Sequence, residues 1–186
     1  RGTDATGIAY NSGGSLKVYK RPLPAHLLWF RIFEDTNVVM GHTRMTTQGS
    51  ERFNANNHPF SGQAGDTNFA LAHNGVLSND KRLRRQHNLP ATKIETDSYI
   101  AVQLLENSGE LSFSSLTSMA EKLEGSFTIS VMTDTDDLYI VKGDNPICIY
   151  HYEKLGFYIY ASTEPILKTA LKQLNMKLGK PTKVKL

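Results

Sequence analysis

The sequence GHTR at residues 41–44 and the sequence HNG at residues 73–75 each follow a short apolar run. NVVM at 37–40 precedes the first, and FALA at 69–72 precedes the second. Short apolar runs that end in polar residues are typical of buried β-strands. We therefore predict two strands whose neighbouring ends present Arg44, Asn74 and Gly75.

Residues 45–68, between these two strands, are polar and show no apolar periodicity. A loop of this length is uncommon inside a compact domain unless it has a binding or covering role. We therefore expect a binding loop here rather than a simple connection.

Arg44, Asn74 and Gly75 suit the chemistry of acyl transfer. A guanidinium group binds a carboxylate through a planar fork of N–H donors, and an amide side chain with a backbone N–H can stabilise one developing oxyanion. The alternative is a structural ion pair for Arg44 and a β-hairpin turn for Asn74-Gly75. Taken alone, HNG between apolar residues favours the turn.

Several motifs in a fixed order favour the catalytic interpretation: HTR at 42–44, TQG at 47–49, NHPF at 57–60, HNG at 73–75 and ETD at 95–97. This set resembles that of class II glutamine amidotransferase domains, which are N-terminal-nucleophile hydrolases. RGTDATG at 1–7 is similar to the segment near the start of such domains. The resemblance implies hydrolysis of the side-chain amide of L-glutamine to glutamate and ammonia, with ammonia passed to a synthase or transferase domain or subunit.

The resemblance also implies roles for individual residues. Arg44 would bind the α-carboxylate of glutamine and Asp97 its α-ammonium group, and Asn74 with Gly75 would form the oxyanion hole. The other residues implied at the site are Arg1 and Asp4 near the nucleophile, His73 beside the substrate, and Thr47 with Gln48 in the covering loop. Met45 and Gln48 replace a tryptophan and a histidine of the glucosamine-6-phosphate synthase branch, so the acceptor stays open.

In the resembled family the nucleophile is an N-terminal cysteine whose own α-amine is the base. The strand that carries it is not among residues 1–186. We therefore predict a single amidotransferase domain over residues 1–186 that lacks its first strand. A noncatalytic glutamine-binding or regulatory module remains the alternative. Cys148, in an apolar strand, is expected to be a packing residue.

Composition excludes several other classes. A length of 186 residues with 39% hydrophobic content fits one domain, and one cysteine cannot form an internal disulfide. A net charge of +3 without a basic aromatic patch argues against nucleic acid, and no apolar run reaches the roughly 18 residues of a membrane span. The histidines lack the spacing of zinc ligands, and the sequence has no phosphate-binding loop, so we predict neither a metal nor a cofactor. We expect the protein to be cytoplasmic.

The remaining pattern predicts an α+β fold. Expected strands lie at 8–10 and 16–19, joined as a hairpin, and at 127–132, 138–142, 147–152 and 157–161, joined as a meander. Expected helices lie at 25–33, at 79–88, after an N-cap at Thr96 or Asp97, at 113–123, and from 162 onward. Antiparallel sheets covered by helices follow from this order, and the resemblance implies the four-layer αββα sandwich.

Overall fold

The structure is a computed structural model that describes residues 2–186. The chain divides into a first compact unit that ends at Gly143 and a second unit, Asp144–Leu186. Each unit has its own β-sheet structure and its own buried apolar side chains. The expectation that residues 1–186 act as a single domain stays a prediction.

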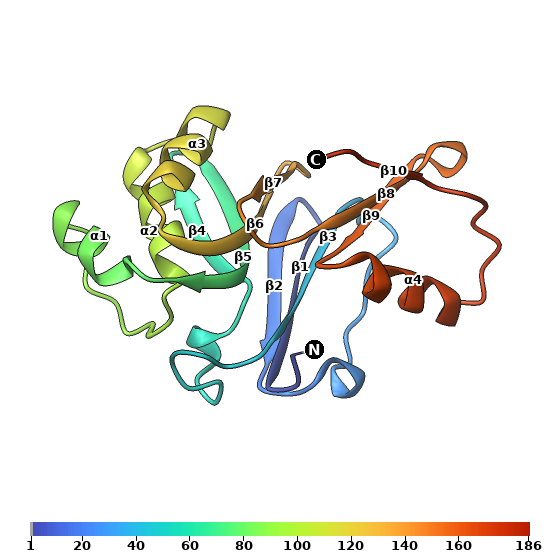
Figure 1. Cartoon of the computed structure of the whole chain (residues 1–186), viewed down its shortest axis with the longest axis horizontal. Helices are drawn as coiled ribbons and strands as arrows, with labels where there is room; N and C mark the ends of the chain where they lie inside the picture. The colour runs from blue at the N-terminus through green and yellow to red at the C-terminus, as the bar shows by residue number, and fades with distance from the viewer. Residues whose placement is uncertain (1) are drawn as a thin grey trace. The chain divides into compact units, whose positions relative to one another are not determined.

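The first unit contains two antiparallel sheets (Figure 1). One sheet has the order β4-β5-β6-β7, formed by Phe60–Ala64, Thr67–Leu77, Gly125–Thr133 and Leu138–Lys142. The other has the order β2-β1-β3, formed by Ser15–Arg21, Ala5–Ser12 and Val39–Arg44. The predicted hairpin is β1 and β2, which pair from Ser12 with Ser15 to Thr6 with Arg21.

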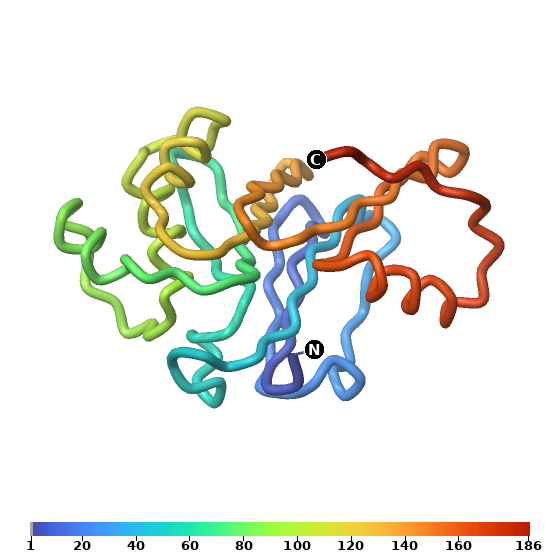
Figure 2. Tube along the Cα trace, viewed as in Figure 1, coloured from blue at the N-terminus to red at the C-terminus, as the bar shows by residue number. Residues whose placement is uncertain are grey.

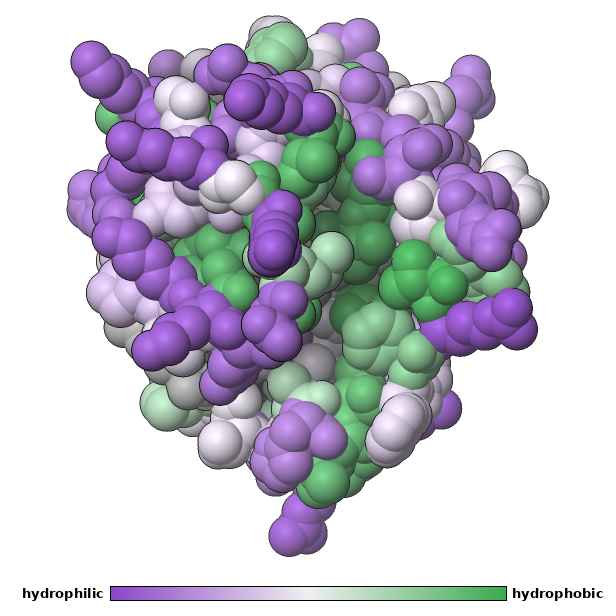
Figure 3. Space-filling model, turned by 90° about the vertical axis from the view of Figure 1, so that its right-hand side faces the viewer, coloured by the Kyte–Doolittle hydropathy of each residue, from purple (hydrophilic) through white to green (hydrophobic). Residues whose placement is uncertain are grey.

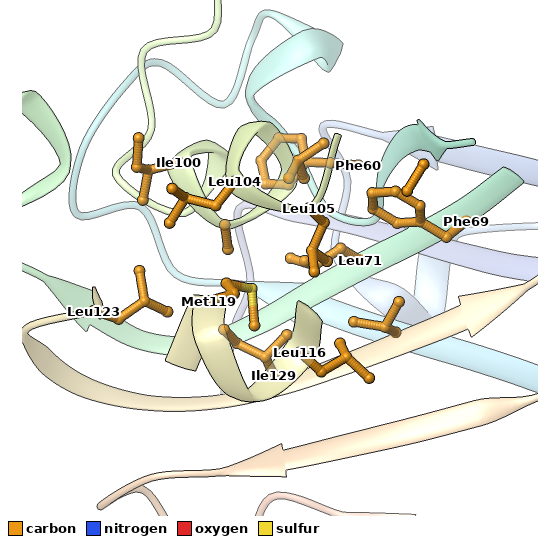
Figure 4. Close-up of a cluster of buried hydrophobic side chains, with 14 of the residues drawn as sticks. Phe60, Phe69, Leu71, Ile100, Leu104, Leu105, Leu116, Met119, Leu123 and Ile129 are labelled. Carbon is orange, nitrogen blue, oxygen red and sulfur yellow. The ribbon is translucent and has the colours of Figure 1, made fainter. Parts of the chain in front are cut away.

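Three helices cover one face of the four-stranded sheet, on the side away from β1–β3 (Figure 1). They are α1 (Asp80–Gln86), α2 (Tyr99–Ser108) and α3 (Phe113–Lys122). Their buried side chains interdigitate with those of the sheet, as Figure 4 shows for Leu105 and Met119 against Leu71 and Ile129. Because this cluster removes apolar side chains from water, it stabilises the unit.

The residues of β5 alternate between two cores. Phe69 and Leu71 pack with the helices, whereas Ala70 and Ala72 pack against the three-stranded sheet. Small alanines let the two sheets approach closely, with Met40 of β3 filling the space between them. This period of two continues along the strand, so the next residues also face opposite layers.

The second unit is a small sheet with one helix. Its strands β8 (Cys148–Tyr152), β9 (Phe157–Ala161) and β10 (Thr182–Lys183) have the order β10-β8-β9. Helix α4 (Glu164–Gln173) packs on this sheet through Leu167. The unit also exposes apolar side chains such as Leu174 and Met176. Figure 3 shows that one face of the molecule carries apolar surface between hydrophilic groups.

These observations confirm the α+β class with antiparallel sheets, and helices α1 to α4 lie near their predicted positions. The predicted helix at 25–33 is wrong. Only Ala25–Leu27 forms a 3-10 helix, and the rest of the connection between β2 and β3 is irregular (Figure 2). Its apolar residues are mostly exposed, with Trp29 at 88%, so they do not supply the buried stripe that a helix here requires.

Three further expectations need correction. The segment 45–68 is not a continuous loop, because it contains a 3-10 helix at Asn54–Asn56 and strand β4. The four late strands do not form one meander, since β7 pairs with β6 whereas β8 pairs with β9 and β10 in a separate sheet. The N-cap of α2 is Ser98, without a side-chain capping bond, rather than Thr96 or Asp97.

Candidate active site

Asn74 and Gly75 lie inside β5, not in a turn. Asn74 pairs with Thr128 and Gly75 with Phe127 of β6. The hairpin interpretation is therefore wrong, because both residues belong to a regular antiparallel ladder. Gly75 has a φ of 149°, which a residue with a side chain rarely adopts. This conformation accounts for glycine at the position.

Arg44 ends β3, opposite Ala5 of β1, and its side chain is buried. Its Nη1 donates to Asn57 Oδ1 at 2.8 Å. Its Nη2 donates to the carbonyl oxygens of Gln48 at 2.5 Å and Gly49 at 3.0 Å. Since a guanidinium group has five N–H donors, two are not engaged by the described residues. A carboxylate would use these two or displace a loop carbonyl.

The loop that begins at Met45 is attached to the segment before α2. Glu95 Oε2 accepts a hydrogen bond of 2.8 Å from Asn56 Nδ2, and Glu95 N donates to Asn56 Oδ1 at 2.9 Å. Gln48 Nε2 donates to Glu95 O at 2.9 Å. Thr47, in the same loop, is exposed. The paired contacts of Asn56 and Glu95 were not predicted, because nothing local in the sequence links residues so far apart.

Asp97 is buried and tied to β5. Its Oδ2 accepts a hydrogen bond of 2.6 Å from the backbone N–H of Leu77, two residues after Gly75. Its Oδ1 accepts a bond of 3.3 Å from Ser98 Oγ, which also contacts His73 Nδ1 at 2.8 Å. Because a hydroxyl group has one hydrogen, and a carboxylate only accepts, His73 Nδ1 donates to Ser98.

Three histidines, His42, His58 and His73, form a cluster that the sequence analysis missed. His42 and His58 have ring centroids 4.2 Å apart, and those of His58 and His73 are 6.5 Å apart. Burial lowers the pKa of His42 to about 4 and lowers the pKa values of His58 and His73 as well. All three rings are therefore neutral near pH 7. The signal in the sequence that could have predicted this cluster is the histidine in each of the motifs HTR, NHPF and HNG.

The charges at the site are arranged around Arg44. Burial lowers the pKa of Arg44, while the carboxylates of Glu51, Asp4 and Asp97 oppose that shift. Asp4 Oδ2 accepts a bond of 2.7 Å from Thr46 N, which lowers the pKa of Asp4. Asp4 and Asp97 therefore both favour the charged form of Arg44. Arg1, the other residue predicted near the nucleophile, lies outside the described residues.

Cys148 lies in β8 of the second unit and is 3% exposed. Burial raises the pKa of its thiol, which disfavours the thiolate form that a nucleophile needs.

Within residues 2–186, no group of histidine, cysteine, aspartate and glutamate side chains has the arrangement of a metal site. No helix in the same range is long and apolar enough to cross a membrane.

A family model described as "Glutamine amidotransferase domain" matches residues 42–169, which include the end of β3, the loop that begins at Met45, β5 and the Asp97 segment. The chain belongs to this family. The resemblance to class II amidotransferases drawn from the motifs is thereby confirmed, and the reaction of the family is glutamine hydrolysis with ammonia transfer.

Curated relatives of this amidotransferase domain are glutamine–fructose-6-phosphate aminotransferases. Those of Staphylococcus epidermidis (strain ATCC 35984) and Staphylococcus aureus (strain Mu50) are 30% and 31% identical to it over 171 and 173 residues. Each alignment covers 87% of this chain, which spans only 28% of the relative's length.

Solved structures agree on the fold of the amidotransferase domain. A glutamine phosphoribosylpyrophosphate amidotransferase from B. subtilis aligns with a TM-score of 0.77 at 19% identity, over 99% of this chain and 39% of that chain. A predicted glutamine amidotransferase from Pseudomonas aeruginosa aligns with a TM-score of 0.56 at 23% identity, over 78% and 62%. The N-terminal-nucleophile type of fold is therefore confirmed.

Proposed function

We propose that this domain binds L-glutamine between Arg44 and Asp97 and hydrolyses its side-chain amide at Asn74 and Gly75. The observation that carries the proposal is the hydrogen bond between Leu77 N and Asp97 Oδ2, at 2.6 Å. It holds a buried carboxylate two residues beyond Gly75, close to the strand that would carry the oxyanion donors. Arg44, whose pKa is influenced by Asp97, supplies the opposite charge.

The two charged groups match the two charges of a free amino acid. Arg44 would bind the α-carboxylate through N–H groups, and Asp97 would bind the α-ammonium through the unused lone pairs of its oxygens. The side-chain amide would then extend toward β5. There, Asn74 Nδ2 and Gly75 N–H would donate to the carbonyl oxygen as negative charge develops on it. Thr47 and Gln48 would cover the bound substrate, with His73 behind it.

The proposed reaction has two acyl-transfer steps. A thiolate attacks the amide carbon of glutamine, and the C–N bond breaks as ammonia leaves with a proton. Water then attacks the resulting thioester, releasing glutamate and restoring the thiol. We assign the thiol to the N-terminal cysteine of the mature protein, with its α-amine as the base. Cys148 does not fit this role, because its thiol is buried and its pKa is raised.

We further propose that the ammonia passes to a synthase or transferase domain or subunit. In the relatives that are about 30% identical to this chain, the matching region makes up 28% of the full length. The names of these relatives describe aminotransfer to fructose 6-phosphate. The acceptor used here is a separate question, because Met45 and Gln48 depart from the glucosamine-6-phosphate synthase branch of the family.

The test is steady-state ammonia release by the natural full-length protein with L-glutamine, compared with D-glutamine and L-asparagine. We expect activity with L-glutamine alone, and mass spectrometry should find an electrophilic glutamine analogue attached to an N-terminal cysteine. Glutamine binding without hydrolysis or labelling would support the noncatalytic module. Absence of glutamine binding would overturn the proposal.

A further inference from the structure

A hydrogen bond joins the two sheets of the first unit beside the candidate site. His42 Nε2, on β3, lies 3.0 Å from the carbonyl oxygen of His73, on β5. A carbonyl group only accepts hydrogen bonds, so His42 Nε2 carries the proton. The acceptor belongs to the peptide group that joins His73 to Asn74. His42 therefore contacts the backbone one residue before Asn74, which would carry an oxyanion donor.

The segment of β5 around His73 pairs with fewer neighbouring strands than the start of β5 does. β4 pairs with β5 only over Thr67–Leu71. Within residues 2–186, the length of β5 from Ala72 onward has a strand partner on the β6 side alone. A contact from β3 at His73 therefore restrains a segment that the β4 ladder does not restrain.

The ring of His42 is itself held in place by its neighbours. His58 packs on it with a centroid distance of 4.2 Å. The backbone around His58 is fixed in turn, because Lys20 Nζ donates to Asn57 O at 2.6 Å and Pro59 O at 3.0 Å. Gly7 permits this approach, since a Cβ atom there would lie 2.2 Å from His58 O.

His42 and Arg44 project from the same face of β3, because they are two residues apart in one strand. The contact to His73 therefore links the strand that would hold the substrate's carboxylate with the strand that would stabilise the oxyanion. The separation of these two groups determines whether the amide carbon reaches the reactive position. Misplacement by about 1 Å can lower a rate by about 100-fold.

We propose that His42 is a positioning residue of the glutaminase reaction: its Nε2–H group holds the His73–Asn74 peptide so that Asn74 and Gly75 point at the substrate oxygen. The inference rests on the proposed function. His42 would touch neither glutamine nor the nucleophile, and would act through the backbone of β5. Loss of this donor should therefore affect kcat more than glutamine binding.

The test compares His42→Gln with His42→Asn and His42→Leu in the natural full-length protein. A glutamine side chain can place an N–H donor near the position of Nε2, whereas asparagine is too short and leucine has no donor. We expect kcat of His42→Leu and His42→Asn to fall by about 10-fold to 100-fold with KM within about threefold, and His42→Gln to keep most of the activity. His26→Leu, at an exposed histidine, is the matched control.

A second measurement reports on the contact without relying on activity. In the NMR spectrum of labelled protein, a proton on His42 Nε2 should show scalar coupling to the His73 carbonyl carbon across the hydrogen bond. Equal kcat in all three folded variants, or a loss in KM rather than kcat, would overturn the inference. If the wild-type protein releases no ammonia from glutamine, the proposed function fails instead, whatever the coupling shows.

Discussion

The backbone N–H of Leu77 donates a hydrogen bond of 2.6 Å to Oδ2 of Asp97. These residues come from different elements, since Leu77 ends β5 and Asp97 precedes α2. The bond fixes a buried negative charge beside the strand that carries Asn74 and Gly75. Asp97 thus combines a structural role, as acceptor for the β5 backbone, with the proposed role of binding the α-ammonium of glutamine.

Replacing Asp97 separates these two roles. Asp97→Asn keeps an oxygen that accepts from Leu77 N but removes the charge, so we expect a stable fold with glutamine affinity reduced by about 10-fold or more. Asp97→Ala should also lower the melting temperature, because Leu77 N would be buried without a partner. Calorimetric titration with glutamine and thermal denaturation measure the two effects. Unchanged affinity in Asp97→Asn would remove Asp97 from the binding site.

Arg44→Ala should weaken glutamine binding by about 30-fold or more, which corresponds to roughly 2 to 4 kcal/mol for a lost charge-assisted contact. Some loss of stability should accompany it, because Arg44 also holds Asn57 and two loop carbonyls. Calorimetry on Arg44→Ala, with Arg52→Ala as a control on an exposed arginine of the same loop, measures the change. Equal affinity in wild type and Arg44→Ala would contradict the assignment.

Asn74→Ala should lower kcat by about 100-fold to 1,000-fold while changing KM little, because an oxyanion donor acts mainly in the transition state. Asn74→Asp should be at least as damaging, since a carboxylate repels the developing negative charge. Steady-state ammonia release by full-length variants of confirmed fold provides the measurement. A near-normal kcat in Asn74→Asp would show that Asn74 is no oxyanion donor.

Stability should fall as the pH is lowered from about 6.5 toward 4. The pKa of His42 is about 4 when folded and about 6.5 when unfolded, so the unfolded state binds more protons in this window. His42 alone contributes on the order of 3 kcal/mol to the loss, and burial shifts His58 and His73 in the same direction.

Urea denaturation at pH 7 and pH 5 measures this dependence. His58→Phe is the informative variant, because both ring nitrogens of His58 are buried without partners among the described residues. A phenyl ring keeps the packing against His42 but cannot be protonated. We expect a smaller loss of stability between the two pH values in this variant, and an identical loss would contradict a neutral buried His58.

Cys148→Ser should lower stability by about 1 to 2 kcal/mol, because a hydroxyl group would replace a thiol in the buried cluster of the second unit. Glutaminase activity of the full-length protein should remain. The measurements are urea denaturation and ammonia release. Loss of activity with a circular dichroism spectrum like that of the wild type would mean that the thiol of Cys148, rather than an N-terminal one, takes part in the reaction.

Local patterns predicted most of the secondary structure. The strand Leu138–Lys142 has the bounds expected from alternation, and α3 begins at the expected Phe113. Strand β4 was missed, because polar FSGQA carries little apolar signal and becomes a strand only by pairing with β5. At residues 25–33 a helix was predicted that the structure does not contain, because the apolar residues there are mostly exposed and have no core to pack against.

The sequence by itself determined the α+β class, the family and the identity of the motif residues, because motif order and hydrophobic period are local properties of the chain. Only the tertiary structure decided that Asn74 and Gly75 lie within a strand. It also revealed the contact of His42 with His73, 31 residues apart, and that of Leu77 with Asp97, 20 residues apart. Such contacts depend on how two sheets and a helix pack, and no single segment encodes that geometry.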